Sequence, residues 1–265
     1  MLYWCINLSI SIIAGIVSLF FVKWYFSLLT VVCTSAALSL FFILLIILIG
    51  ILTPMLNYKK PSKFSNFLIT EGYGYLSAMA GIHCKFIGKE KLPKDTPFLL
   101  VSNHISNFDN MITSYVLRSK KIVWISKKEN FKLPVARHYM KRACYLCLDR
   151  GNLKAGLDIM TRAGEVMKNK IASVGVYPEG KRGDGIAMRP FKAGCFKSVL
   201  WGQCPLVICS IKGTENIKKH FPFRPTKVTL EILDVLPYEQ IKDKSTIELA
   251  EYSQKIVQQS LDSKD

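Results

Sequence analysis

The first 58 residues carry almost no charge, and this feature restricts the possible folds more than any other. Lys23 is the only charged side chain among them, and residues 38–52 contain thirteen Leu, Ile or Phe residues. At roughly −0.3 to −0.6 kcal/mol each on the insertion scale, these thirteen contribute about −4 to −8 kcal/mol toward residence in a bilayer. Since about 20 residues cross the hydrocarbon core, the length also suffices for a membrane helix.

Two apolar runs, residues 1–22 and 25–58, flank the Lys23-Trp24 connection and predict a helical hairpin. The hairpin either crosses the bilayer or dips into one leaflet, and the remaining alternative is a buried hairpin of a soluble protein. A cleavable signal peptide does not fit, because no basic segment precedes the first run and a second apolar run follows.

Three lysines follow the second apolar run, namely Lys59, Lys60 and Lys63. By the positive-inside tendency they place the next part of the chain in the cytoplasm. We therefore expect a membrane-anchoring hairpin at residues 1–58 and a cytoplasmic α/β domain at residues 59–265.

The second part of the chain is strongly basic. Residues 59–265 hold 35 of the 36 basic side chains and all 19 acidic ones, a net charge of +16. Such a domain prefers nucleic acid, an acidic membrane surface, or phosphorylated and CoA-like ligands. No nucleic-acid-reading signature is apparent, so we expect membrane lipids and no nucleic acid as partners. The aromatic-rich residues 64–83 predict either an interfacial segment or an ordinary helix packed on the domain.

From about residue 82, strand-like and helix-like segments alternate, which predicts an α/β fold with a helix-covered mixed sheet. The expected strands are 82–87, 97–102, 121–126, 144–149, 172–177, 205–211 and 226–235. The expected helices are 106–118, 133–142, 153–169, 192–202 and 244–261. Residues 228–235 alternate with period two, as a half-exposed edge strand would.

One histidine and one aspartate follow the strand at 97–102. The segment Ser-Asn-His-Ile-Ser-Asn-Phe-Asp, residues 102–109, puts His104 five residues before Asp109. If His104 lies in the turn and Asp109 in the first helical turn, the carboxylate can reach back to the imidazole. That pairing fixes the tautomer and leaves the other ring nitrogen as a general base. A structural histidine at a strand end is the alternative.

Three more strand ends carry cations. Residues 176–184, Val-Tyr-Pro-Glu-Gly-Lys-Arg-Gly-Asp, form a turn in which glycine permits close approach and Arg182 offers a planar fork for phosphate oxygens. Ser-Lys-Lys-Glu at 126–129 and Leu-Asp-Arg at 148–150 end two other strands. Each alone is as well explained by a solvated turn or a surface ion pair. Because ligands gather at the carboxyl ends of strands in open α/β sheets, together they predict a site for an anion.

The blocks N-H-x-S-x-x-D, K-K-E, L-D-R and Y-P-E-G-K-R, followed by Cys-Pro-Leu-Val at 204–207, stand in an order that resembles the glycerolipid acyltransferases, specifically the 1-acylglycerol-3-phosphate acyltransferase family. The resemblance covers roughly residues 80–215. It implies that His104 is the catalytic base and that Asp109 orients and polarises it. The substrate-binding residues that it implies are Lys127, Arg150 and Arg182 at the acceptor phosphate, Glu179 and Gly180 at the acceptor, and Pro205 at the acyl or acceptor group.

The implied reaction moves an acyl chain from acyl-CoA or acyl-carrier protein to the free hydroxyl of 1-acylglycerol-3-phosphate, which makes phosphatidic acid in phospholipid biosynthesis. The acyl thioester is a co-substrate, and neither a cofactor nor a metal is required. Alternatives are glycerol 3-phosphate or another lysophospholipid as acceptor, and a non-catalytic, membrane-anchored binder of anionic lipid. A thioester hydrolase fits less well, because its G-x-S-x-G signature is absent.

Overall fold

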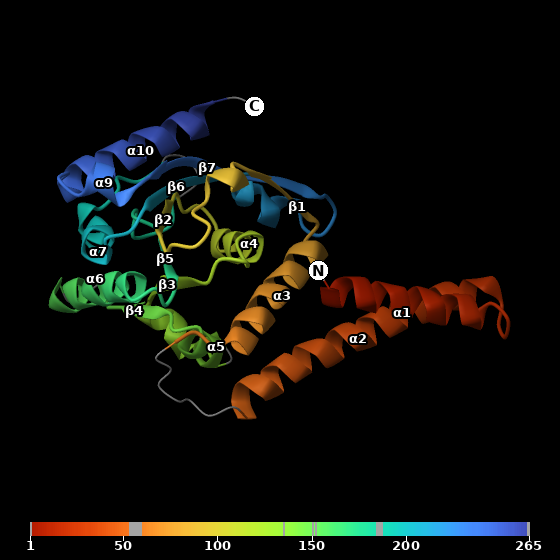
Figure 1. The fold of residues 1–265 in the computed structure, drawn as a ribbon. Coiled ribbons are helices and arrows are strands. Elements are labelled where there is room, and N and C mark those ends of the chain that lie inside the picture. The colour runs from red at the N-terminus through yellow and green to blue at the C-terminus, as the bar shows by residue number, and fades with distance from the viewer. Residues whose placement is uncertain are drawn as a thin grey trace.

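The computed structural model describes residues 2–52, 60–134, 136–149, 151, 153–183 and 188–263 (Figure 1). The helices are α1 Leu2–Ser18, α2 Trp24–Leu52, α3 Lys63–Met79, α4 Phe108–Val116, α5 Ala136–Arg142, α6 Leu153–Lys168, α7 Lys197–Gly202, α8 Ile217–His220, α9 Tyr238–Ile241 and α10 Thr246–Asp262. The strands are β1 Ile82–Ile87, β2 Leu99–Ser102, β3 Ile122–Lys127, β4 Leu146–Leu148, β5 Ser173–Val176, β6 Leu206–Lys212 and β7 Thr226–Leu236.

The described strands form one seven-stranded mixed sheet in the order β1-β7-β6-β2-β5-β3-β4. Strands β6, β2, β5, β3 and β4 are mutually parallel, and β7 pairs antiparallel with β6. The expected α/β fold with a helix-covered mixed sheet is therefore confirmed. As a consequence of the parallel arrangement, five strands end at the same edge of the sheet.

Helices cover both faces of the sheet, because the strand side chains alternate between two hydrophobic cores. In β2, Leu99 and Val101 pack toward α6, α7 and α10, whereas Leu100 packs toward α4 and α8. All three side chains are fully buried. Each fully buried aliphatic side chain of this size contributes about 1.5–3 kcal/mol. The two cores hold the central strands, and with them the edge at which the strands end.

Strand β7 is an internal strand, so the expectation of an edge strand at 228–235 is wrong. It pairs with β1 on one side and with β6 on the other, while β1 and β4 form the edges. Its burial does alternate, with Val228, Leu230 and Ile232 fully buried and their neighbours partly exposed. A period-two pattern indicates that one face of a strand is buried. It does not indicate how many neighbouring strands pair with that strand.

The apolar N-terminus forms the expected helical hairpin, which projects from the domain (Figure 1). Helices α1 and α2 cross closely at Gly15, where a Cβ atom would overlap with Cγ2 of Val31. Helix α2 is long and apolar enough to cross a membrane, whereas α1 is apolar but shorter. The expected boundary between hairpin and domain, at residue 58, lies outside the described residues.

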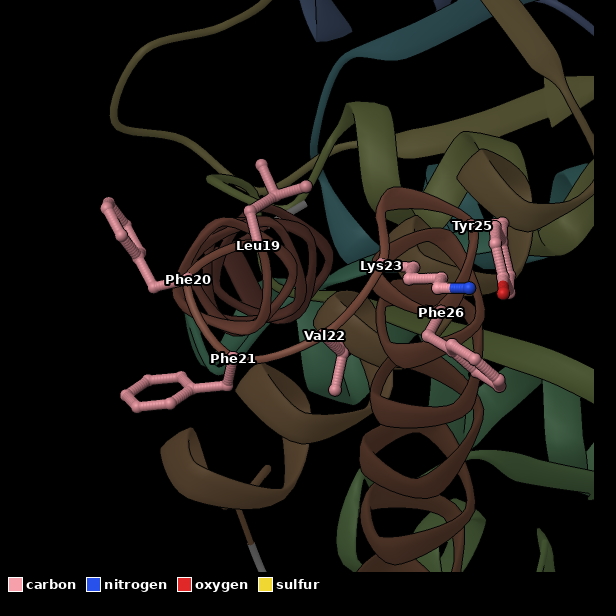
Figure 2. A pocket seen from close by; sticks show the side chains of 7 residues that line it. All are labelled: Leu19, Phe20, Phe21, Val22, Lys23, Tyr25 and Phe26. Atoms are coloured by element: carbon pink, nitrogen blue, oxygen red, sulfur yellow. The ribbon is translucent and has the colours of Figure 1, made fainter.

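The tip of the hairpin is apolar and exposed. Phe20 and Phe21, with exposed fractions of 83% and 81%, point outward from the turn, whereas the side chain of Lys23 points to the opposite side (Figure 2). Trp24 and Tyr25 at the start of α2 are exposed as well. Exposed aromatic side chains of this kind are typical of a segment that contacts lipid.

Helix α3 lies between the hairpin and the α/β domain. The Tyr75 hydroxyl donates a hydrogen bond of 2.6 Å to Oγ of Ser39 on α2, and α3 packs against α4 and α5. A second link runs from the Tyr139 hydroxyl on α5 to the carbonyl oxygen of Ile46 on α2, at 2.6 Å. The segment 64–83 is thus mainly a helix packed on the domain, although Phe64 and Phe67 remain exposed.

Candidate active site

The candidate site lies at the edge where the parallel strands end. His104 follows β2, Lys127 ends β3, Tyr177 follows β5 and Thr214 follows β6. The carboxyl ends of parallel strands in an open α/β sheet are the usual place for a ligand. The topology thus brings together residues that are more than 100 positions apart in the sequence.

His104 and Asp109 form a direct pair. His104 lies in the turn after β2, Asp109 lies in the first turn of α4, and the imidazole Nδ1 is 2.9 Å from Oδ2 of the carboxylate. The Asp109 side chain is fully buried, whereas the His104 ring is partly exposed. A carboxylate at Nδ1 favours the tautomer that carries its hydrogen there. The lone pair on Nε2 is then available to accept a proton.

Asp109 is held by three further donors. The backbone N–H groups of Ile105 and Ser106 each donate to Oδ2 at 2.7 Å, and the Thr214 hydroxyl donates to Oδ1 at 2.6 Å. Because all of these groups donate, the carboxylate is fixed as an acceptor in one orientation. The sequence reasoning missed Thr214, since it lies 105 residues after Asp109 and no local signal connects the two.

The imidazole of His104 stacks on the Tyr177 ring with a centroid distance of 4.2 Å and an interplanar angle of 14°. Tyr177 stacks in turn on Trp124 at 5.2 Å, and the Trp124 indole N–H donates to Oγ of Ser114 at 2.9 Å. Burial, together with the nearby Asp109 carboxylate, raises the pKa of Tyr177 well above its usual value. Tyr177 is therefore a neutral aromatic support that fixes the plane of the imidazole.

Glu179 lies beneath the site and supports two backbone segments. Its carboxylate accepts hydrogen bonds from the backbone N–H of His104 at 2.6 Å and from that of Arg189 at 3.0 Å. Burial raises the pKa of Glu179, and these hydrogen bonds partly offset the increase. Gly180 follows with a φ of +73°, in the left-handed region that glycine adopts more readily than other residues. The turn after β5 is thereby held against the loop that carries His104.

A cleft of about 1040 Å³ opens in front of His104. Its polar part is lined by His104, Lys127, Gly180, Lys181 and Arg182. Its apolar part extends under the helices near the hairpin and is lined by Ile46, Leu68, Tyr73, Leu76, Tyr139 and Met140. One end of the cleft thus suits an anion and the other suits a hydrocarbon chain. The sequence reasoning missed the apolar lining, because helices α2, α3 and α5 contribute it jointly.

The structure places the other predicted site residues as follows. Lys127, Gly180 and Arg182 line the cleft with His104, whereas Asp109 and Glu179 lie buried behind it. Arg150 lies outside the described residues. Pro205 lies at the amino end of β6, where its carbonyl oxygen accepts the Leu99 N–H at 3.0 Å, and this is the opposite end of the strands from His104.

The described ranges contain no group of three His, Cys, Asp or Glu side chains that could hold a metal ion. Cys195, Cys204 and Cys209 are buried free thiols. Burial raises the pKa of Cys195, Cys204 and Cys209 to about 12, so these thiols are poor nucleophiles near neutral pH. The candidate general base at the cleft is His104, which is paired with Asp109.

Three comparisons with known proteins bear on this site. Residues 83–212 match the family model described as Acyltransferase. A 1-acyl-sn-glycerol-3-phosphate acyltransferase of Saccharomyces cerevisiae is 26% identical over 195 residues, which cover 72% of this chain and 62% of that protein. The human 1-acyl-sn-glycerol-3-phosphate acyltransferase beta is 30% identical over 160 residues, which cover 59% of this chain and 57% of that protein.

A solved structure has the same fold. The 1-acyl-sn-glycerophosphate acyltransferase of Thermotoga maritima aligns with a TM-score of 0.63 at 22% identity and covers 83% of this chain and 87% of that chain. The present chain spans 62% and 57% of the length of the yeast and human relatives. The matched segment contains the sequence blocks that carry His104, Asp109, Lys127, Glu179 and Arg182. Residues 83–212 of this chain are therefore similar to the acyltransferase family, and the chain shares the fold of the Thermotoga maritima protein.

Proposed function

We propose that this chain transfers an acyl group from acyl-CoA or acyl-carrier protein to the free hydroxyl of 1-acylglycerol-3-phosphate, giving phosphatidate. The observation that carries the proposal is the pair of a buried Asp109 and a partly exposed His104 at a cleft with one cationic and one apolar end. An acceptor that has both a phosphate and an acyl chain matches both ends. The names of the yeast and human relatives support the same acceptor.

In the proposed mechanism, Nε2 of His104 removes the proton of the acceptor hydroxyl as its oxygen attacks the thioester carbonyl. Asp109 stabilises the imidazolium that forms and keeps the ring in place through the Nδ1 hydrogen bond. General-base assistance of this kind is worth roughly 10²–10⁴-fold in rate. The imidazolium then returns the proton to the departing thiolate, so no acyl-enzyme intermediate forms and His104 is regenerated.

We propose roles for the remaining residues from the chemistry of the two ends of the cleft. We place the acceptor phosphate at Lys127 and Arg182, since guanidinium and ammonium groups bind phosphate oxygens well. Lys181, on the same loop, adds a third cation at this end. The apolar lining from α2, α3 and α5 receives an acyl chain. No cofactor or metal takes part in the proposed chemistry, and the thioester itself is the co-substrate.

We also propose that the hairpin anchors the protein in a membrane, with the α/β domain on the cytoplasmic side. The apolar α2 and the exposed Phe20 and Phe21 at the tip support the anchoring. The lysines after the hairpin, including Lys60 and Lys63, support the orientation. Both the acceptor and the product are membrane lipids, so an anchored active site shortens the search for substrate.

The test is acyl transfer from acyl-CoA to lysophosphatidate by the full chain in mixed micelles, with wild type beside His104→Ala. We expect His104→Ala to lower kcat by about 10²–10⁴-fold. The matched control is His83→Ala, because His83 is exposed on β1 and does not line the cleft. Wild-type turnover by His104→Ala would overturn the mechanism.

A panel of acceptors separates the alternatives within the same experiment. Faster transfer to glycerol 3-phosphate or to a lysophospholipid with a larger headgroup would replace lysophosphatidate as the acceptor. Release of free fatty acid without acceptor would indicate a hydrolase. Binding of anionic lipid without turnover for any acceptor or acyl donor would indicate a non-catalytic binder.

A further inference from the structure

The connection between α8 and β7 exposes aromatic side chains, and the packing of the α/β domain does not explain why they are exposed. Phe223 is 92% exposed, which is the highest value for a large apolar side chain among the described residues, and Phe221 is 53% exposed. The next most exposed are Phe20 and Phe21 at the hairpin tip. We call residues 218–227 the basic loop. Exposed aromatic side chains that cluster in this way commonly mark a contact surface.

The charges of the basic loop are all positive. Lys218, Lys219, Arg224 and Lys227 are exposed, and the sequence contains no acidic residue between Glu215 and Glu231. Strand β1 extends this charge, because Lys85 is exposed two residues beyond His83, which lies opposite Lys227 in the sheet. The surface that surrounds the two phenylalanines is therefore complementary to an anionic partner.

The basic loop is attached to the end of α3. The Thr226 N–H donates to the carbonyl oxygen of Gly81 at 2.9 Å, directly after the last turn of α3. That turn exposes Met79 and Leu76, and Leu76 also lines the cleft. In Figure 1 the connection to β7 leaves the sheet beyond the end of α3, on the side from which the hairpin projects. The basic loop, the exposed face of α3 and the cleft are thus connected through one helix.

We propose that the basic loop is a second membrane-contact site, separate from the hairpin, which binds the anionic headgroups of a bilayer while Phe221 and Phe223 enter the interface. Cationic side chains beside exposed aromatic rings are the combination that interfacial segments use. A nucleic acid would also meet the positive charge, but it would not account for the apolar side chains of α3 beside the loop. The proposal rests on the membrane location proposed above and adds a surface that orients the cleft toward the bilayer.

The test uses the wild-type full chain reconstituted in vesicles that contain a photoactivatable phospholipid with its reactive group near the headgroup. We expect peptides that contain residues 221–225 to be labelled in vesicles with about 30% phosphatidylglycerol. The labelling should fall at least about fivefold in pure phosphatidylcholine vesicles. The internal reference is the segment 238–244, because most of its side chains are exposed and it lies on the side of the domain near α10.

Variants separate the aromatic and the charged contributions. Phe223→Ser and the pair Lys218→Glu and Lys219→Glu should each lower labelling of the loop severalfold. The matched controls are Ile247→Ser and the pair Lys244→Glu and Lys255→Glu, which change exposed residues on or next to α10 in the same way. Hairpin peptides should remain labelled in every variant, and this shows that the anchor still holds the chain in the vesicle.

The turnover of a short-chain, water-soluble acceptor and thioester measures activity independently of binding to the vesicle. It should stay within about twofold of wild type for Phe223→Ser, because Phe223 does not line the cleft. A chain that is labelled at the loop but inactive would contradict the proposed function and leave the loop proposal standing. Loop labelling no higher than that of 238–244 would overturn the loop proposal. Loss of single-stranded RNA binding in the lysine variants, with lipid labelling unchanged, would overturn it in favour of a nucleic-acid surface.

Discussion

The hydroxyl of Thr214 donates a hydrogen bond of 2.6 Å to Oδ1 of Asp109, and both side chains are buried. This contact joins the end of β6 to the start of α4 and fixes the carboxylate that orients the imidazole of His104. Thr214 is therefore a positioning residue that acts through Asp109 and does not touch the cleft.

Removal of this hydroxyl should impair catalysis more than folding. In Thr214→Val, Oδ1 of Asp109 loses its donor, and an unsatisfied buried acceptor costs about 1–3 kcal/mol. If that cost appears in the transition state, kcat should fall by about fivefold to 150-fold. Thr214→Ser keeps the hydroxyl and should recover most of the rate. An equal kcat for the Val and Ser variants, with an altered KM only, would show that the hydroxyl does not act through Asp109.

The stack of His104 on Tyr177 should contribute to the rate through the plane of the imidazole. Tyr177→Leu removes the stacking surface, and aromatic pairs of this kind are worth about 0.5–1.5 kcal/mol. We expect a lower kcat and a lower Tm in Tyr177→Leu, while Tyr177→Phe keeps both values close to wild type. Steady-state kinetics and thermal unfolding measure the two effects. Identical kcat values for the Leu and Phe variants would exclude a role for stacking.

Glu179 should make the stability of the fold depend on pH. Burial raises its pKa above the ordinary glutamate value of 4.5, so the protonated form is favoured in the folded state. Its contribution to stability is therefore full below pH 4.5 and is lost as the pH rises through the raised pKa.

Denaturant unfolding at several pH values above 4.5 measures this dependence. The free energy of unfolding should decrease less with rising pH in Glu179→Gln than in wild type. Glu251→Gln serves as the control, because Glu251 is exposed on α10. An unchanged slope in Glu179→Gln would mean that the hydrogen bonds to Glu179 fully compensate for its burial.

Three thiols should resist alkylation in the folded protein. With pKa values of about 12, Cys195, Cys204 and Cys209 are thiolates in only about one molecule in ten thousand at pH 8. Iodoacetamide at pH 8 should leave their peptides unmodified until denaturant is added, as peptide mass spectrometry will show. Modification of these three at the rate of the less buried Cys147 would contradict the burial that raises their pKa.

The sequence predicted the sheet well because local signals set its strands. Every expected strand range overlaps one observed strand, and β1 agrees with residues 82–87 at both ends. Local signals do not determine which strands pair, since the pairing of β7 with both β1 and β6 depends on residues far away in the chain. The edge position predicted for β7 failed for this reason.

The candidate site was predictable only in part. The contact of His104 with Asp109 follows from one turn and one helix start, so a local pattern contains it. Thr214 and Ile46 reach the site through tertiary packing, and no spacing in the sequence indicates them. For Pro205, the local motif indicated a site residue, but the direction of β6 places it at the far end of the strands.

Helix α2 begins at the hairpin tip with Trp24 and, with Ile46, also forms part of the cleft wall. Its 29 residues correspond to a rod of about 43 Å, at 1.5 Å per residue. A hydrocarbon core is about 30 Å thick, so such a rod must tilt or leave one end outside. In the proposed membrane-anchored state, a change in the tilt of this rod also shifts Ile46, and with it one wall of the cleft.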